Sequence, residues 1–262
     1  MVKLYDSLSP LMTIATGGKM LNFGYWGDSS ANTTPLEAQQ MLCAQVGELA
    51  ELASAKAVID VGSGLGAPAS YWRSCHESLQ VACVNINFSQ LQDSDGARVS
   101  LVNATSTALP FSSGSVDRVV ALESAQHFRP LDRFMQESAR VLASGGLLVM
   151  AIPVLKLRKK LHFLSLGILS VTWSSEHYGP EYVQSAIRNA GLSIETSRYI
   201  GPRVYGPLAD YYLANREDLK PRILAEYPAY LEKLLYRSIL KMKQLSDGGH
   251  IEYVLIKARK AR

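Results

Sequence analysis

The residues best suited to chemistry lie in a glycine-rich run directly after a short apolar segment, Asp60-Val61-Gly62-Ser63-Gly64-Leu65-Gly66. Glycines let the backbone turn tightly and approach a ligand closely. A helix that follows such a turn offers unpaired N–H groups and the positive end of its dipole. The run therefore predicts a site for a nucleotide-type ligand. The looser pattern Gly62-x-Gly64-x-x-Ala67 also fits dinucleotide-binding enzymes, so the run alone does not decide which nucleotide.

Polar side chains stand where the next two apolar runs end. The second run leads into Asn85, which is followed by Asn87 and Gln90, and the third ends at Asn103. Dinucleotide-binding enzymes usually hold the ribose diol with an acidic residue at the end of the second strand. Asparagine can donate one hydrogen bond and accept another, but it lacks the charge that strengthens a carboxylate–diol pair. This pattern disfavours a nicotinamide dinucleotide without excluding it.

A histidine and a glutamate follow the fourth apolar run, in the segment Glu123-Ser124-Ala125-Gln126-His127-Phe128. His127 is our first candidate for a general base, because open α/β sheets bind ligands where their strands end and imidazole titrates near neutral pH. The alternative is that His127 only caps a loop or contacts a cofactor. Glu123 is the second catalytic candidate. If it is buried beside a cationic ligand, a structural or electrostatic role fits it better than proton transfer.

These side chains need elements that bring them to one edge of a sheet. Five short apolar runs have the length and composition of buried parallel strands. They cover residues 57–61, 81–86, 99–102, 116–122 and 147–152. Apolar residues at helical spacing lie between the fourth and fifth runs, from Leu131 to Leu142. Because strands that alternate with crossover helices form parallel sheets, we expect a parallel sheet covered by helices on both faces.

The flanks of this region carry further start and stop signals. Thr34 and Glu37 around Pro35 have the spacing of a capping box and predict a helix beginning there. A second helix is expected between Gly179-Pro180 and Gly191, followed by a strand over residues 192–196. A third amphipathic helix covers 231–242, and a last strand covers 252–257. We expect that last strand to be antiparallel, at or near an edge of the sheet.

Composition limits the kinds of partner. The chain has 262 residues, of which 47% are hydrophobic and 19% charged, as expected of a globular protein. Its net charge, 27 − 23 = +4, is too small to indicate nucleic acid by itself. Three cysteines fit no metal-ligand or disulfide pattern, and the first 20 residues show no signal peptide. We therefore expect no metal and a cytoplasmic location.

At this point the chain resembles the class I S-adenosylmethionine (SAM)-dependent methyltransferases. The resemblance rests on blocks at residues 58–66, 103–111, 115–119 and 137–147, whose order and spacing match that family. Segments 21–26 and 123–127 resemble a narrower branch, which includes sugar O-methyltransferases and lipid, sterol, quinone, polyketide and terpenoid methyltransferases. The resemblance implies a Rossmann-like α/β fold with a mostly parallel seven-stranded sheet, helices on both faces and a helical lid.

The resemblance also implies which residues hold the cofactor. They are Tyr25, Trp26, Asp60, Gly62, Ser63, Gly64, Asn85, Ile86, Gln90, Asn103, Ala104, Thr105 and Leu122. The glycine loop lies under the methionine part of SAM, Asp60 faces its ammonium, and Asn103 and Ala104 meet the adenine edge. Tyr25 and Trp26 close over the cofactor. Asn85 and Asn103 depart from the family, whose members commonly have aspartate there; asparagine keeps an acceptor and gains a donor.

We therefore predict a single methyltransferase domain over residues 1–262. It consists of an N-terminal helical cover (1–55), a SAM-binding core (56–152), a lid and substrate region (153–245) and a final strand and tail (246–262). It would convert SAM to S-adenosylhomocysteine (SAH) and methylate an O or C atom of a small metabolite, isoprenoid or lipid-like acceptor. The basic and apolar segment 156–173 is too short to span a bilayer. We predict that this segment forms part of the lid. A weak contact of the segment with a membrane surface stays open, and so does oligomerisation of the protein.

Three alternatives stay open at this level. The first is an NAD(P)-dependent oxidoreductase, which the glycine loop alone permits. The second is a nucleic-acid methyltransferase. The small net charge and the absence of the Asn/Asp-Pro-Pro-Tyr/Phe and Pro-Cys motifs argue against it. The third is a protein of the same fold that uses SAM structurally, as a cyclase or a non-catalytic partner.

Overall fold

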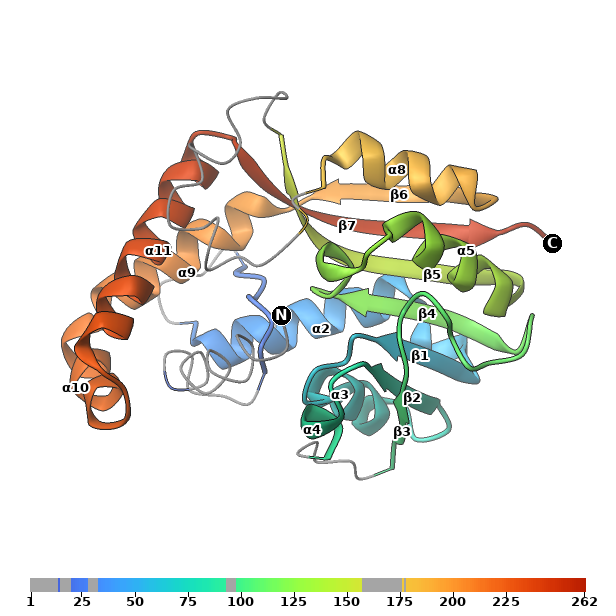
Figure 1. Cartoon of the computed structure of the whole chain (residues 1–262), viewed down its shortest axis with the longest axis horizontal. Coiled ribbons are helices and arrows are strands. Elements are labelled where there is room, and N and C mark those ends of the chain that lie inside the picture. Colours follow the sequence, from blue (N-terminus) through green and yellow to red (C-terminus); the bar gives the residue numbers. More distant parts are fainter. Residues whose placement is uncertain (1–13, 15–19, 28–32, 93–97, 157–175, 177) are drawn as a thin grey trace. The chain divides into compact units, whose positions relative to one another are not determined.

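The structure, a computed structural model, describes residues 14, 20–27, 33–92, 98–156, 176 and 178–262 (Figure 1). The chain divides into two compact units. The sheet unit comprises Leu42–Val154, Glu176–Tyr199 and Tyr253–Arg262. The helical unit comprises Met1–Met41, Leu155–Ser175 and Ile200–Glu252. Each unit is described by itself.

A seven-stranded, mostly parallel sheet forms the centre of the sheet unit (Figure 1). Its strands are β1 Ala57–Val61, β2 Gln80–Asn85, β3 Ser100–Asn103, β4 Val116–Leu122, β5 Leu142–Leu155, β6 Leu192–Tyr199 and β7 Ile251–Lys260, in the order β3-β2-β1-β4-β5-β7-β6. β2 and β4 both pair with β1 in parallel, as do β3 with β2 and β5 with β4. β7 pairs antiparallel with β6, one strand in from the edge. The predicted fold class and the antiparallel last strand are confirmed.

Eight helices accompany the sheet in the described part of the chain. They are α2 Pro35–Leu49, α3 Ala67–Cys75, α4 Phe88–Gln92, α5 Leu131–Val141, α8 Pro180–Asn189, α9 Tyr205–Ala214, α10 Arg216–Glu226 and α11 Ala229–Asp247. The predicted capping box at the start of α2 is confirmed, since the Thr34 hydroxyl accepts from the Glu37 N–H at 3.3 Å and the Glu37 carboxylate accepts from the Thr34 N–H at 2.8 Å. Three short 3₁₀ turns, Leu52–Ser54, Ala125–His127 and Gly201–Arg203, complete the described elements.

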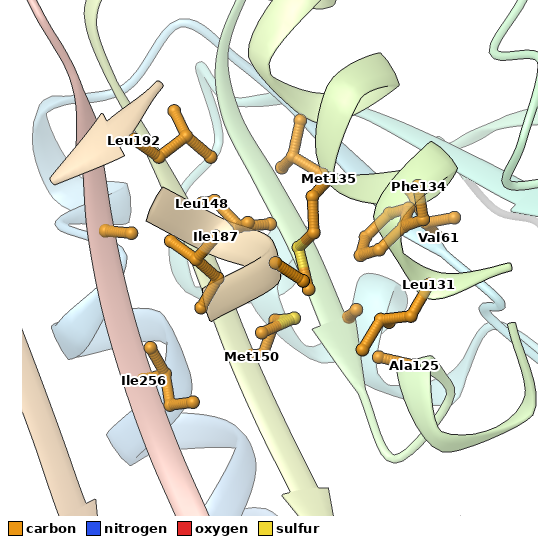
Figure 2. Close-up of a cluster of buried hydrophobic side chains, with 14 of the residues drawn as sticks. Val61, Ala125, Leu131, Phe134, Met135, Leu148, Met150, Ile187, Leu192 and Ile256 are labelled. Atoms are coloured by element: carbon orange, nitrogen blue, oxygen red, sulfur yellow. The ribbon is translucent and has the colours of Figure 1, made fainter. Parts of the chain in front are cut away.

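The main apolar core lies between one face of the sheet and helices α5 and α8 (Figure 2). Phe134 and Met135 of α5 and Ile187 of α8 are fully buried there against β4, β5 and β7. Alternate residues of the central strands point into this core, among them Ile59 and Val61 of β1. Because side chains alternate along a strand, Asp60 must point to the opposite face.

The opposite face is covered by the later part of α2 and by α3. The Trp72 indole of α3 donates to the Cys43 carbonyl of α2 at 2.8 Å, and a Cβ on Gly47 would lie only 3.2 Å from that indole. Arg118 of β4 points to this side and donates to the Ala50 carbonyl just beyond α2. The sheet is therefore covered on both faces, as predicted, and Asp60 lies on the α2 side.

The helical unit contains the elements that the sequence indicated least clearly. Its three helices α9, α10 and α11 occupy residues 205–247, where the sequence pattern predicts only the last. Gly206 and Pro207 lie in the first turn of α9, and Pro221 lies inside α10. Glycine and proline at these positions are usual in turns, and they obscured both helices.

Two further differences concern the predicted boundaries. β5 begins at Leu142, five residues before the predicted strand, and its register against β4 shifts between Val116 and Arg118. Gly145, with φ 74°, therefore sits inside a bulged strand rather than in a turn before it. The basic and apolar segment predicted as part of the lid lies, apart from Lys156, outside the described residues. Within the residues described, no helix has both the length and the apolar character needed to cross a membrane.

Candidate active site

The glycine loop lies at the carboxyl edge of the sheet, between β1 and β4. The strand order reverses here, because the chain continues from β1 to β2 on one side and returns to β4 on the other. Open α/β sheets bind ligands at this kind of crevice. Gly62, Gly64 and Gly66 have φ values of 75°, 56° and 75°, a left-handed region that side chains rarely adopt.

Gly62 is held by close contact as well as by its backbone angle. Its N–H donates to the Val84 carbonyl of β2 at 2.7 Å, and a Cβ at this position would lie 2.4 Å from the Cβ of Ser124. The Ser124 hydroxyl in turn donates to the Val61 carbonyl at 2.6 Å. The loops after β1 and β4 are thus packed directly together, and only glycine fits at residue 62.

Asp60 supplies a buried acid beneath this loop. Its side chain is almost completely buried on the α2 side, and burial raises its pKa to about 7. One of its carboxylate oxygens has no hydrogen-bond partner, whereas the buried Ser63 hydroxyl interacts with the Cys83 thiol. Burial, with a further contribution from the charge of Asp60, raises the pKa of the Cys43 and Cys83 thiols, so both thiols stay protonated. An unpartnered acid in this position suits a cationic ligand group.

Asn85 and Asn103 are engaged mainly with the protein itself. The Asn85 amide donates to the Gly64 carbonyl at 3.1 Å and to the Gln90 side chain at 3.0 Å, while its oxygen accepts from the Asn87 N–H at 3.1 Å. Both amide hydrogens of Asn85 are therefore used. Asn103 donates to the carbonyls of Asn85 and Ile86 at 2.9 and 3.1 Å, which ties β3 to the end of β2.

The remaining predicted residues of this edge surround the same loops. Ile86 is two-thirds exposed, and the Ala104 N–H donates to the Asn85 carbonyl at 3.2 Å. The Thr105 hydroxyl bonds to that of Thr107 at 3.0 Å. Leu122 is buried at the end of β4. The structure thus gathers every predicted cofactor residue of the sheet unit along the carboxyl ends of β1 to β4.

Glu123 and His127 follow β4 at this edge. Glu123 adopts a positive φ of 52°, and its carboxylate accepts a hydrogen bond from the Tyr253 hydroxyl of β7 at 2.7 Å. His127 ends the 3₁₀ turn, and its Nε2 lies 3.1 Å from the amide nitrogen of Gln126. Tyr253 and Gln126 were absent from the predicted site. Gln126 lay in the segment that carried the resemblance, whereas no local pattern marked Tyr253.

Tyr25 and Trp26 belong to the helical unit. The Tyr25 N–H donates to the Ala38 carbonyl and the Trp26 N–H to the Arg203 carbonyl, both at 2.8 Å. Trp26 is buried with its ring centroid 5.9 Å from that of Tyr211, and its indole N–H has no partner. The cofactor contacts predicted for Tyr25 and Trp26 stay a prediction.

Comparison with known proteins assigns the family. The profile of the family described as "Methyltransferase domain" matches residues 59–150. Erythromycin 3''-O-methyltransferase of Saccharopolyspora erythraea is 28% identical over 268 residues, covering 94% of this chain and 85% of that protein. A methyltransferase of Streptomyces halstedii is 31% identical over 221 residues, covering 76% of this chain and 77% of that protein.

Solved structures agree in fold. The cyclopropane synthase MmaA2 of Mycobacterium tuberculosis superposes with a TM-score of 0.85 at 14% identity, over 99% of this chain and 97% of that one. The glycine cradle, the buried unpartnered acid and the strand order agree with these relationships. The chain therefore belongs to the class I SAM-dependent methyltransferases.

Proposed function

We propose that this methyltransferase methylates a hydroxyl oxygen of a small natural-product acceptor and that His127 takes up the hydroxyl proton. The observation that carries the proposal is the placement of the His127 turn beside the glycine cradle, since Ser124 of the same segment packs against Gly62. The relative from S. erythraea, which this chain matches over most of its length, is named for O-methylation of erythromycin.

The residues of the carboxyl edge fit SAM. Asp60 offers a buried carboxylate oxygen without a partner, which suits the ammonium of the methionine part, and Gly62 lets the loop above it pack against Ser124 where any side chain would collide. When bound, SAM supplies an electrophilic methyl group on a sulfonium sulfur. The exposed Ile86 offers an apolar surface on which an adenine ring can pack, and the backbone of Ala104 lies at the same edge.

His127 is the best-placed proton acceptor of the described residues that follow β4. A neutral imidazole at the edge of the cradle can accept the proton of a hydroxyl as its oxygen attacks the methyl group. Glu123 is instead held by the Tyr253 hydroxyl in a strained backbone conformation. We propose that Glu123 shapes the edge electrostatically and does not act as the base.

The proposal is tested by calorimetric titration with SAM, SAH and NADH, followed by turnover with macrolide and polyketide glycosides that carry free hydroxyls. We expect saturable binding of SAM and SAH, no response to NADH, and an O-methylated product identified by mass and NMR. His127→Asn should keep SAM affinity within about twofold and lower kcat by roughly 10²- to 10⁴-fold, the usual contribution of general base catalysis.

His76→Asn is the matched control, because His76 follows α3, at the opposite edge of the sheet from the loop. It should leave both binding and turnover unchanged. Full activity of His127→Asn would remove the base role while leaving the family assignment intact. A product methylated on carbon would overturn the proposed O-methylation.

A further inference from the structure

Gln126 is a buried residue whose amide connects two parts of the active-site edge. The residue is 7% exposed, and its backbone carbonyl accepts from the Glu176 N–H at 2.9 Å. The side-chain nitrogen donates to the Glu123 carbonyl at 2.6 Å and lies 3.1 Å from His127 Nε2. Its side-chain oxygen is buried and has no partner.

The Glu123 carbonyl decides which way this amide points. A carbonyl oxygen can only accept a hydrogen bond, so the nitrogen of the Gln126 amide, and not its oxygen, must face it. The amide nitrogen has two hydrogens, one of which is taken by the Glu123 carbonyl. The other is directed at His127 Nε2, which must then be the acceptor of that bond.

We infer that Gln126 is a positioning residue that holds neutral His127 in the tautomer protonated on Nδ1, which reserves Nε2 as the proton-accepting atom. A neutral imidazole has one N–H and one lone pair, and a donor facing Nε2 places the proton on Nδ1. The tautomer follows from the geometry alone, whereas its catalytic use rests on the proposed function.

In that use, the acceptor hydroxyl replaces the Gln126 N–H at Nε2. The O–H bond would break, its proton would form an N–H bond at Nε2, and an oxygen electron pair would form the bond to the methyl carbon while the carbon–sulfur bond of SAM breaks and its electron pair leaves with the sulfur of SAH. His127 becomes an imidazolium with both nitrogens protonated. Gln126 opposes this charge until the hydroxyl arrives, because its N–H bonds only to the neutral form. Among the described residues, the charged groups next to this turn include Glu123, bound by Tyr253, and Glu176, paired with Arg129 and bonded through its N–H to the Gln126 carbonyl.

The test is a long-range ¹H–¹⁵N NMR experiment on free protein labelled at its five histidines. The His127 signals are assigned by their loss in His127→Asn. We expect wild-type His127 at pH 8 to be protonated on Nδ1. Gln126→Leu should shift it mostly to the Nε2-protonated tautomer that imidazole prefers in water. Gln136→Leu, the same change on the exposed side of α5, should leave the tautomer unchanged.

Gln126→Glu is a second test in case Gln126→Leu does not fold, because glutamate has nearly the same size as glutamine. Its carboxylate accepts and cannot donate, so Nε2 should become protonated and the His127 proton affinity should rise roughly tenfold or more. Wild-type His127 protonated on Nε2, or an unchanged tautomer in either folded Gln126 variant, overturns the inference. If the tautomer behaves as expected but His127→Asn keeps full turnover, only the proposed base role fails.

Discussion

At the scale of single residues, the buried acid Asp60 determines how cofactor affinity at this site depends on pH. Desolvation raises its pKa to about 7, and no cation in the described part of the chain offsets that burial. Its oxygen without a partner is costly in the free protein and useful only when a cationic group binds. The buried Asp60 therefore lowers the stability of the free protein and raises its affinity for a cationic ligand.

We predict that SAM affinity rises roughly tenfold between pH 5.5 and 7, since the ligand ammonium stays protonated there and binds the ionised carboxylate. Asp60→Asn should bind SAM at least tenfold more weakly at pH 7 and show no such rise. Calorimetry across this range measures both. An equal pH dependence in wild type and Asp60→Asn would contradict the role of Asp60.

The raised pKa of Asp60 predicts the opposite pH dependence for the stability of the free protein. A folded-state pKa above the unfolded value contributes stability below the unfolded pKa, and this contribution is lost as pH rises toward about 7. Thermal unfolding without ligand should therefore show wild type losing stability relative to Asp60→Asn between pH 5 and 7.

At the scale of elements, an ion pair on α5 between the buried Glu137 and the partly exposed Arg140 holds the segment that follows β3. The Glu137 carboxylate accepts from the Leu109 N–H at 2.8 Å and pairs with Arg140 at 2.8 Å. Arg140 donates to the carbonyls of Leu109 and Phe111, both at 2.8 Å. These residues belong to two of the blocks that carried the family resemblance, and their contact explains why the blocks occur together.

We predict that Glu137→Ala lowers the free energy of unfolding by about 3 kcal/mol, because it leaves a partly buried guanidinium and a buried N–H without their acceptor. The exposed Glu181→Ala on α8 should change it by less than about 0.5 kcal/mol. Urea unfolding measures both variants. The Arg140 hydrogen bonds lower the Glu137 pKa, so this stabilisation is present above the unfolded pKa and is lost as pH falls toward the lower folded value.

A second contact at this scale joins distant strands. Tyr253 of β7 reaches Glu123 after β4, although β5 lies between these two strands in the sheet. The bond fixes the carboxylate at the start of the turn that carries Gln126 and His127. The positive φ of Glu123 is thus supported from a strand 130 residues away in the sequence.

At the scale of the whole molecule, cofactor binding and stability are linked. A ligand that binds only the folded protein at a hundred times its Kd stabilises it by about 2.7 kcal/mol. We predict that saturating SAM raises the Tm of wild type by several degrees. Gly62→Ala should lower the Tm of the free protein and abolish the SAM-dependent rise, because its Cβ collides with Ser124.

Gly114→Ala is the matched control for this prediction. Gly114 has a similar positive φ of 68°, but nothing lies within 4 Å of a Cβ placed there. It should lose about 1 kcal/mol from backbone strain and keep the full SAM response. A SAM response in Gly62→Ala equal to that of Gly114→Ala would remove the glycine cradle from the cofactor site.

The amino-acid sequence by itself determined the sheet and the edge at which the site lies. Apolar runs such as residues 57–61 and 116–122 predict buried strands because neighbouring residues carry the pattern, and the glycines that follow mark the turn. The capping box at Thr34 is equally local. Helices α9 and α10 escaped prediction because proline and glycine within them have the local character of turns.

Only the tertiary structure decided what the polar side chains of the site do. Asn85 has the right position for a cofactor ligand, yet both its amide hydrogens bond to the protein. The partners of Glu123 and Glu137 come from segments that the strand order and helix packing bring near, and no local pattern encodes them. A residue type states which hydrogen bonds a side chain can make, but folding alone determines which groups are within 3 Å to make them.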